Sequence, residues 1–137
     1  MTDHHGQCLC GQTGYDTGGD PLWVTVCYCR FCQHATGSDR MIEPIFERAG
    51  FCFTGAAPSV YTLPSEGSGQ DIHVHFCATC GTHILTRIPG AHLVLKIGTL
   101  DDPAWFAAPK IAIYTIDRQP FHLIPDIPEF ERLPPPQ

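Results

Sequence analysis

Short apolar segments alternate with turn residues along the whole chain, and none of the apolar segments is long. The segments are rich in β-branched and aromatic residues and are bounded by Gly, Pro, Asp and Ser, as strands are. They cover residues 22–26, 41–46, 51–53, 59–63, 72–76, 83–88, 93–97 and 111–116. A helical period of 3.6 residues is not sustained beyond a turn or two. The pattern therefore predicts an all-β fold built from many short strands.

Residues 72–76 show the clearest alternation. Ile72, Val74 and Phe76 fall on one face of the predicted strand. His73 and His75 fall on the other face. A His-x-His pair can bind a metal, but strand alternation explains it equally well as a solvated polar face. We expect the solvated face.

The length of 137 residues suits one domain with a substantial core. We expect a single domain over residues 1–137, with its core in residues 6–130 and a proline-rich end at 131–137. Residues 120–137 hold six of the thirteen prolines and are predicted to form an extended strap over the sheets. The expected anchors of this strap are Phe121, Leu123, Ile124, Ile127 and Phe130.

The formal charge of −6 argues against binding to nucleic acid, because Lys and Arg supply the affinity for its phosphates. No apolar run reaches the roughly 18 residues of a membrane span, so we expect no membrane partner. The first residues lack the cationic and apolar parts of a signal peptide, and we therefore expect a cytoplasmic protein. Thiols stay reduced in the cytosol, where clustered cysteines are more often metal ligands than disulfides.

Four of the eight cysteines form two pairs at metal-ligand spacing. Cys8 and Cys10 lie two residues apart in an extended segment, so both thiols point to one face. Gly11 then lets the chain turn away from them. Cys77 and Cys80, followed by a glycine, have the Cys-x-x-Cys spacing of structural zinc sites. Together the pairs predict one closed zinc site with four thiolate ligands.

Three further cysteines, Cys27, Cys29 and Cys32, lie within six residues at the end of a predicted strand. A zinc ion with three protein ligands keeps a fourth position open, as catalytic sites do. We therefore expect a second, exchangeable zinc here; the alternative is a disulfide with a spare thiol. The eighth cysteine, Cys52, lies between two phenylalanines and is predicted to be a small buried hydrophobe.

Four motifs, in order along the chain, give it a family resemblance. They are Gly6-x-Cys8-x-Cys10-Gly11, Cys27-x-Cys29-x-x-Cys32 followed by Gly37-Ser38, Phe76-Cys77-x-x-Cys80-Gly81, and Gly98-x-Leu100-Asp101-Asp102-Pro103. The chain resembles the glutathione-dependent formaldehyde-activating enzyme family, also called the centromere protein V family. It departs from the common family pattern at Tyr28, where His is frequent, and at Gln33, where Arg is frequent.

The resemblance implies a β-tent fold of packed antiparallel sheets, as in a Rab-exchange-factor family, held together by zinc. It assigns a structural zinc to Cys8, Cys10, Cys77 and Cys80, and a catalytic zinc to Cys27, Cys29 and Cys32. The implied reaction is the addition of glutathione to formaldehyde, by an enzyme of the carbon–sulfur lyase class.

Three thiolates leave a zinc ion with net negative charge, which makes it a weak Lewis acid. Such an ion is better suited to binding a small substrate thiol and ionising it for attack on a small aldehyde. Arg30 and His34 are candidates for binding a substrate carboxylate or moving a proton. Two alternatives are a zinc-stabilised binding module without turnover and a methionine sulfoxide reductase with Cys52 as nucleophile. The identities of the thiol and aldehyde, and the oligomeric state, stay open.

Overall fold

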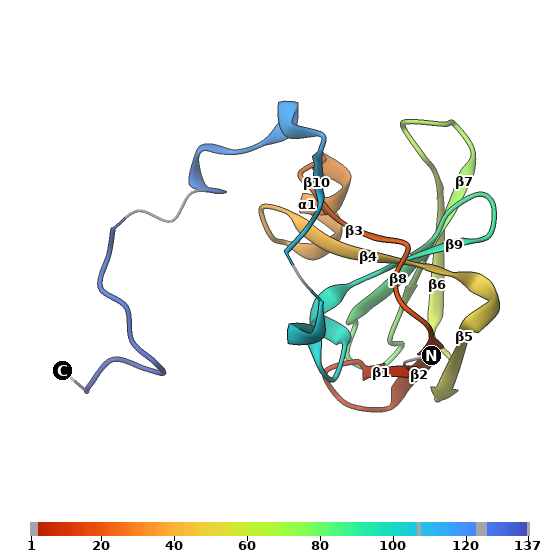
Figure 1. Cartoon of the computed structure of the whole chain (residues 1–137), viewed down its shortest axis with the longest axis horizontal. Coiled ribbons are helices and arrows are strands. Elements are labelled where there is room, and N and C mark those ends of the chain that lie inside the picture. Colours follow the sequence, from red (N-terminus) through yellow and green to blue (C-terminus); the bar gives the residue numbers. More distant parts are fainter. Residues whose placement is uncertain (1–2, 107, 123–125, 137) are drawn as a thin grey trace.

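The computed structural model describes residues 3–106, 108–122 and 126–136, and strands dominate it (Figure 1). The smaller sheet has the order β1 (Asp3–Gln7), β2 (Thr13–Gly18) and β5 (Phe51–Gly55). The larger sheet has the order β10 (Ile111–Ile113), β3 (Trp23–Cys27), β4 (Met41–Glu47), β9 (His92–Leu95), β8 (His83–Arg87), β7 (Asp71–Phe76) and β6 (Ser59–Pro64). The helical elements are α1 (Arg30–Thr36) and the 3-10 helices η1 (Arg48–Gly50), η2 (Ile97–Thr99), η3 (Pro103–Trp105), η4 (Thr115–Asp117) and η5 (Pro120–His122). None of the helices among these residues has the length and apolar character that a membrane crossing requires.

The mostly β architecture predicted from the pattern is confirmed, with one difference in strand direction. Strand β10 pairs parallel with β3, whereas the other paired strands of the described residues run antiparallel. The sequence pattern did not predict β1 and β2. Their residues are rich in Gly and Asp, which have low strand propensity. Pairing of β2 with both β1 and β5 makes strands of these segments.

The hydrophobic core lies between the two sheets. Tyr15 of β2 is stacked on Phe51 of β5, with ring centroids 5.4 Å apart. These rings pack with Phe46, Leu85 and Leu93 of the larger sheet, all fully buried. Burial of each such side chain stabilises the fold by roughly 1.5–3 kcal/mol. Because the core occupies this face of the larger sheet, the opposite face is the one available for a functional site.

Cys52 is exposed, so the prediction that it is a buried core thiol is wrong. It lies in β5, where Phe51 and Phe53 pack against the core. Side chains alternate along a strand, so the residue between two inward-facing phenylalanines must point outward. The two phenylalanines that suggested burial of Cys52 in fact require that its side chain be exposed.

The expectation of a solvated histidine face on β7 is wrong for His75. Its ring is 8% exposed and stacked on Phe53 of the smaller sheet, at 5.5 Å between ring centroids. Burial, aided by the charge of nearby Arg87, lowers the pKa of His75 to about 4. His73 is half-buried and its Nδ1 lies 2.8 Å from the Thr62 hydroxyl. Ile72 and Val74 on one face of β7 and His75 on the other are all buried, so alternation alone does not say which face meets water.

The C-terminal segment does not form the predicted strap. Residues 126–136 run away from both sheets (Figure 1). Three of the expected anchors are exposed, Phe121 by 67% and Ile127 and Phe130 by 52% each. The other two, Leu123 and Ile124, lie outside the described residues. Proline has no N–H to donate, so this segment adds poorly to a sheet edge, and β10 already occupies the edge beside β3.

Gly6 lies where β1 meets the segment after η2, and its replacement by alanine is expected to destabilise the protein. An added Cβ would overlap the Tyr15 ring and lie 2.5 Å from the Thr99 carbonyl oxygen. We expect Gly6→Ala to lower the free energy of unfolding, measured in urea, by about 1–3 kcal/mol. Gly98→Ala is the matched control, because no atom lies within 4 Å of its added Cβ. Equal stability of the two variants would contradict this packing of β1.

Candidate metal centres and the adjoining cavity

The structure brings Cys8, Cys10, Cys77 and Cys80 together. Their four Sγ atoms lie within 4.8 Å of one another. The Sγ atom of Cys10 is 3.5 Å from that of Cys8 and 3.7 Å from that of Cys77. Tetrahedral zinc with Zn–S bonds near 2.3 Å requires sulfurs about 3.8 Å apart. The cluster therefore has the dimensions of a closed four-thiolate site, and it joins the N-terminal segment to the end of β7.

Two turns of similar geometry present these sulfurs. In the first turn, the Cys8 N–H donates to the Thr13 carbonyl at 2.9 Å, and the Gly11 N–H to the Cys8 carbonyl at 3.1 Å. In the second, the Cys77 N–H donates to Thr82, and the Gly81 N–H to Cys77, both at 2.9 Å. Gly11 and Gly81 both have φ of +78°, which glycine adopts without steric cost.

Polar groups around the second turn favour thiolates. The Thr82 hydroxyl lies 3.2 Å from the Cys80 Sγ. Hydrogen bonds from the Thr82 side chain and backbone lower the pKa of Cys80 to about 5. The N–H groups of Thr79 and Cys80 point at the Cys77 Sγ, each at 3.4 Å. Cys77 and Cys80 are therefore ready for a cation.

Cys27, Cys29 and Cys32 converge where β3 passes into α1. Their Sγ atoms also lie within 4.8 Å of one another, and those of Cys29 and Cys32 are 3.1 Å apart. Cys29 is the N-cap residue of α1, and its sulfur accepts a hydrogen bond from the Cys32 N–H at 3.3 Å. We refer to these three residues as the cysteine triad.

The triad can ionise fully only beside a cation. Hydrogen bonds from the thiols of Cys27 and Cys32 lower the pKa of Cys29 to about 3. The hydrogen bond to Cys29 in turn raises the pKa of Cys27 to about 12. The protein by itself thus stabilises one thiolate among the three, and a divalent cation would stabilise all three. Either cysteine cluster can hold a metal ion, and soft thiolate sulfurs suit zinc. The individual ligand roles stay predictions.

A cavity of about 250 Å³ lies beside the triad, on the face of the larger sheet that points away from the core. Cys29, Cys32 and Phe31 line it at the start of α1. Its other lining residues are Glu43, Leu63, Pro64, Ser65, Glu66, Gly67, Ile72, Thr86, Ile88, Val94, Lys96 and Tyr114. The exposed surface of this lining is mostly apolar, and Glu43, Glu66 and Lys96 are its charged members, so the triad opens into a largely apolar space.

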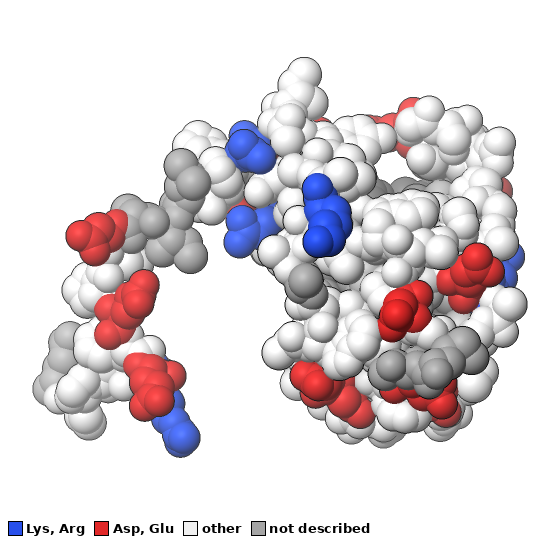
Figure 2. Space-filling view, in the orientation of Figure 1, with Lys and Arg blue, Asp and Glu red and all other residues white. Residues whose placement is uncertain are grey.

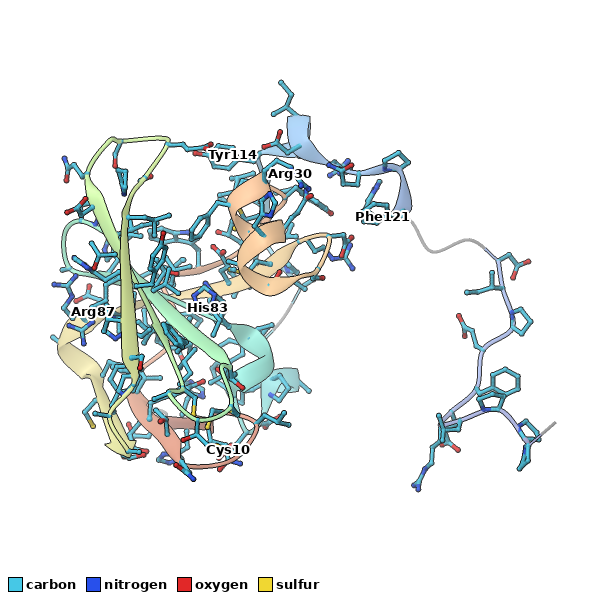
Figure 3. The ribbon with its side chains drawn as sticks, turned by 180° about the vertical axis from the view of Figure 1, so that it is seen from behind. Cys10, Arg30, His83, Arg87, Tyr114 and Phe121 are labelled. Carbon is cyan, nitrogen blue, oxygen red and sulfur yellow. The ribbon has the colours of Figure 1, made fainter. Side chains whose placement is uncertain are left out.

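Tyr114 closes one side of this cavity. It lies between α1 and the loop that joins β6 to β7 (Figure 3). Its hydroxyl would lie 3.0 Å from a Cβ added at Gly67 of that loop, which shows how closely the two segments meet. Among the described residues Tyr114 is the one non-glycine with positive φ, at 54°. Such backbone strain is retained where the surrounding structure requires it, often at functional sites.

The floor of the cavity carries a buried pair of charges, Glu43 and Lys96, which the sequence pattern did not reveal. Each residue is 7% exposed, and Lys96 Nζ lies 3.9 Å from a Glu43 carboxylate oxygen. The same oxygen lies 3.6 Å from the Cys32 Sγ. Burial raises the pKa of Glu43 and lowers that of Lys96.

Strand register explains why this pair was missed. Strands β4 and β9 pair Ile45 with Val94. Extending that antiparallel register by two residues sets Glu43 opposite Lys96. Charged residues in strands are ordinarily solvated, and nothing local in the sequence says that this face is covered. The alternation along β4 indicates which residues share a face of the strand. It does not indicate what covers that face.

Arg30 and His34 lie on the outer side of α1, away from the cavity. They are exposed and line a separate depression with Arg40, Phe121 and His122. Arg30 donates to the Gln33 side-chain oxygen and its Nη2 lies 3.3 Å from His34 Nε2. On the face drawn in Figure 2, several basic side chains lie together near α1 and β10, and several acidic ones lie along the C-terminal segment.

The two positions that depart from the family pattern are structural. Gln33 is buried, and its Nε2 donates to the carbonyls of Tyr28 at 2.8 Å and Asp117 at 2.9 Å. Tyr28 is also buried, under the Arg118 guanidinium at 4.6 Å. Both residues fix the triad segment against the chain that follows β10, and so they help to hold Tyr114 over the cavity.

The exposed thiol of Cys52 is not part of this cavity. It lies in the smaller sheet, whereas the cavity is formed by the larger sheet, α1 and the β6–β7 loop. Because Cys52 is exposed, burial does not argue against its being reactive. We assign it no role in the cavity because it lies in the other sheet.

Comparison with known proteins agrees with this geometry. The sequence model of a family described as "Glutathione-dependent formaldehyde-activating enzyme" matches residues 3–117. A solved protein of Rhodobacter sphaeroides superposes with a TM-score of 0.57 and 17% sequence identity, over 71% of this chain and 87% of that one. At this identity the likeness concerns the fold alone. A search of curated proteins finds no match.

Proposed function

The chain belongs to the glutathione-dependent formaldehyde-activating enzyme family, and from this membership we propose that it catalyses reversible addition of a small thiol to formaldehyde or another small aldehyde. The thiol is glutathione or a compound like it. The reaction forms a C–S bond in one direction and breaks it in the other, which is carbon–sulfur lyase chemistry. The observation that carries the proposal is the convergence of three cysteines, two of which, Cys29 and Cys32, line a largely apolar cavity.

Both cysteine clusters fit zinc. Cys8, Cys10, Cys77 and Cys80 supply a complete set of ligands for a structural ion, whereas the triad leaves one coordination position for a substrate. A zinc ion bound by the triad would keep a substrate thiol ionised at neutral pH. The triad itself would hold the ion on the cavity wall, with Cys27 and Cys32 buried and Cys29 partly open.

The residues around the triad would orient the reactants and exclude water. Leu63, Ile72 and Val94 line the cavity with apolar surface. Water competes for a small aldehyde by hydrating it, so apolar walls that limit the access of water favour attack by sulfur. A volume of about 250 Å³ is small for a ligand pocket, which typically measures roughly 300–1,000 Å³. The cavity therefore suits the reacting end of the thiol and a small aldehyde, while the rest of a molecule such as glutathione extends outside. Arg30 and His34 remain candidate contacts for a carboxylate of that outer part.

The proposal is tested with ¹³C-formaldehyde and a series of thiols, glutathione first. We expect zinc-loaded protein to accelerate exchange between free aldehyde and its S-hydroxymethyl adduct, measured by NMR exchange spectroscopy. The catalysed rate should rise linearly with protein concentration and disappear after chelation of the more labile zinc. A rate equal to the uncatalysed one for every thiol would sink the enzyme hypothesis and favour a zinc-stabilised binding module.

A further inference from the structure

Lys96 is buried where few described groups can satisfy it. Its side chain is 9% exposed, and it lines the cavity beside the triad. A lysine side chain carries three N–H donors when protonated, and two when neutral. Its Nζ donates to the Val94 carbonyl at 3.4 Å, the outer limit of a hydrogen bond. The Glu43 oxygen at 3.9 Å is beyond that limit. At least one donor is therefore available to a ligand.

The charged groups around Lys96 favour an oxygen atom as the acceptor of its available N–H. Among the described residues that line the cavity, Lys96 is the only cationic side chain. The Glu43 carboxylate connects it to the triad, 3.6 Å from the Cys32 Sγ and 3.9 Å from Lys96 Nζ. Lys96 Nζ therefore lies at most 7.5 Å from the Cys32 Sγ, the sum of these two distances, and a thiolate bound beside the triad would share one cavity with the Lys96 amine. An aldehyde between them would offer its carbon to the sulfur and its oxygen to the nitrogen.

We propose that Lys96 is a catalytic residue that donates a hydrogen bond to the carbonyl oxygen of the aldehyde, and that Glu43 positions it. The proposal rests on the proposed function. The sulfur electron pair forms the C–S bond, and the C=O π pair moves onto the oxygen, where the Lys96 N–H stabilises the developing negative charge. The oxygen then takes a proton from water, which replaces the proton lost when the thiol ionised. The balance is one thiol plus one aldehyde giving one S-hydroxyalkyl adduct.

The kinetic test is Lys96→Met, which keeps the length of the side chain and removes the donor. We expect the addition rate at saturating thiol to fall by about 100-fold, as for loss of one oxyanion donor. Zinc content and the dissociation constant of the thiol should stay within about twofold of the parent, because Lys96 contacts neither sulfur nor metal in this arrangement. Lys110→Met is the matched control, since Lys110 is exposed and is the only other lysine. A parental rate in Lys96→Met overturns the proposal.

A double variant separates a catalytic role from simple charge balance. If Lys96 served only to neutralise Glu43, removing both charges in Glu43→Gln/Lys96→Met would restore the rate. We expect the double variant to fold, since it leaves no unpaired charge, and to stay about 100-fold slow. Recovery of the parental rate in the double variant would overturn the proposal.

A binding experiment tests Lys96 without any turnover. The protein has two lysines, so ¹⁵N-lysine labelling gives two Nζ signals that the single variants assign. Formamide serves as an unreactive carbonyl probe. We expect it to shift the Lys96 Nζ signal and leave that of Lys110 in place. If formamide shifts the Lys96 Nζ signal but the protein does not catalyse addition, the carbonyl site is supported and only the proposed function is overturned. An unshifted Lys96 signal overturns the carbonyl site.

Discussion

Replacing Cys80 with serine is expected to unfold the protein and release one zinc per chain. Cys80 is one of four sulfurs that join the N-terminal turn to the end of β7. Structural zinc contributes roughly 10–16 kcal/mol of apparent binding free energy, comparable with or larger than the roughly 5–15 kcal/mol stability of a domain. The measurements are circular dichroism, thermal melting and zinc content per chain.

Cys52→Ser is the matched control for this change. It makes the same substitution at an exposed cysteine outside both clusters, and surface changes of this kind usually alter stability by no more than about 0.5 kcal/mol. We expect it to retain two zinc ions and the parental melting temperature. A soluble Cys80→Ser protein with parental zinc content and melting would show that the four cysteines do not form a stabilising site.

Cys29→Ser is expected to abolish the proposed reaction while leaving the protein folded. The substitution removes one of three sulfurs from the triad, so the zinc content should fall from about two ions per chain to about one. The fold should survive because Cys29 is the N-cap of α1, and serine is among the most favourable N-cap residues. The adduct exchange rate should drop to that of the uncatalysed reaction.

Chelation provides an independent comparison for the triad. An open site with three protein ligands should lose its metal before a closed site with four. The parent should therefore release its first zinc without a change in circular dichroism, and reach the state of Cys29→Ser. Retention of two zinc ions and of the parental rate by Cys29→Ser would contradict the role of the triad.

Local chemistry could be predicted from the sequence because short spacings fix geometry. Cys77 and Cys80 are three residues apart and followed by a glycine, and in the structure a tight turn aims both sulfurs at one point. The alternation in residues 72–76 likewise predicted strand β7 within one residue. These predictions depend on bond lengths, turn geometry and side-chain alternation, all of which act within a few residues.

What lies opposite each strand was decided only by the tertiary structure. Alternation placed His73 and His75 on one face, but only the smaller sheet explains why His75 is buried against Phe53. The same holds for Glu43 in β4 and Lys96 just after β9, which lie about 50 residues apart in sequence. Their meeting depends on the register of β4 with β9 and on the cover provided by α1 and Tyr114.

The sequence by itself therefore determined the strands other than β1 and β2, the two cysteine clusters and the family. The tertiary structure decided which face of each strand is covered, where the triad opens, and which charged residues lie beside it. The physical reason is that strand type and ligand spacing are set by neighbours along the chain. Register and burial are set instead by pairing between distant segments, where a shift of one strand by one residue would put Glu43 and Lys96 on opposite faces of the sheet.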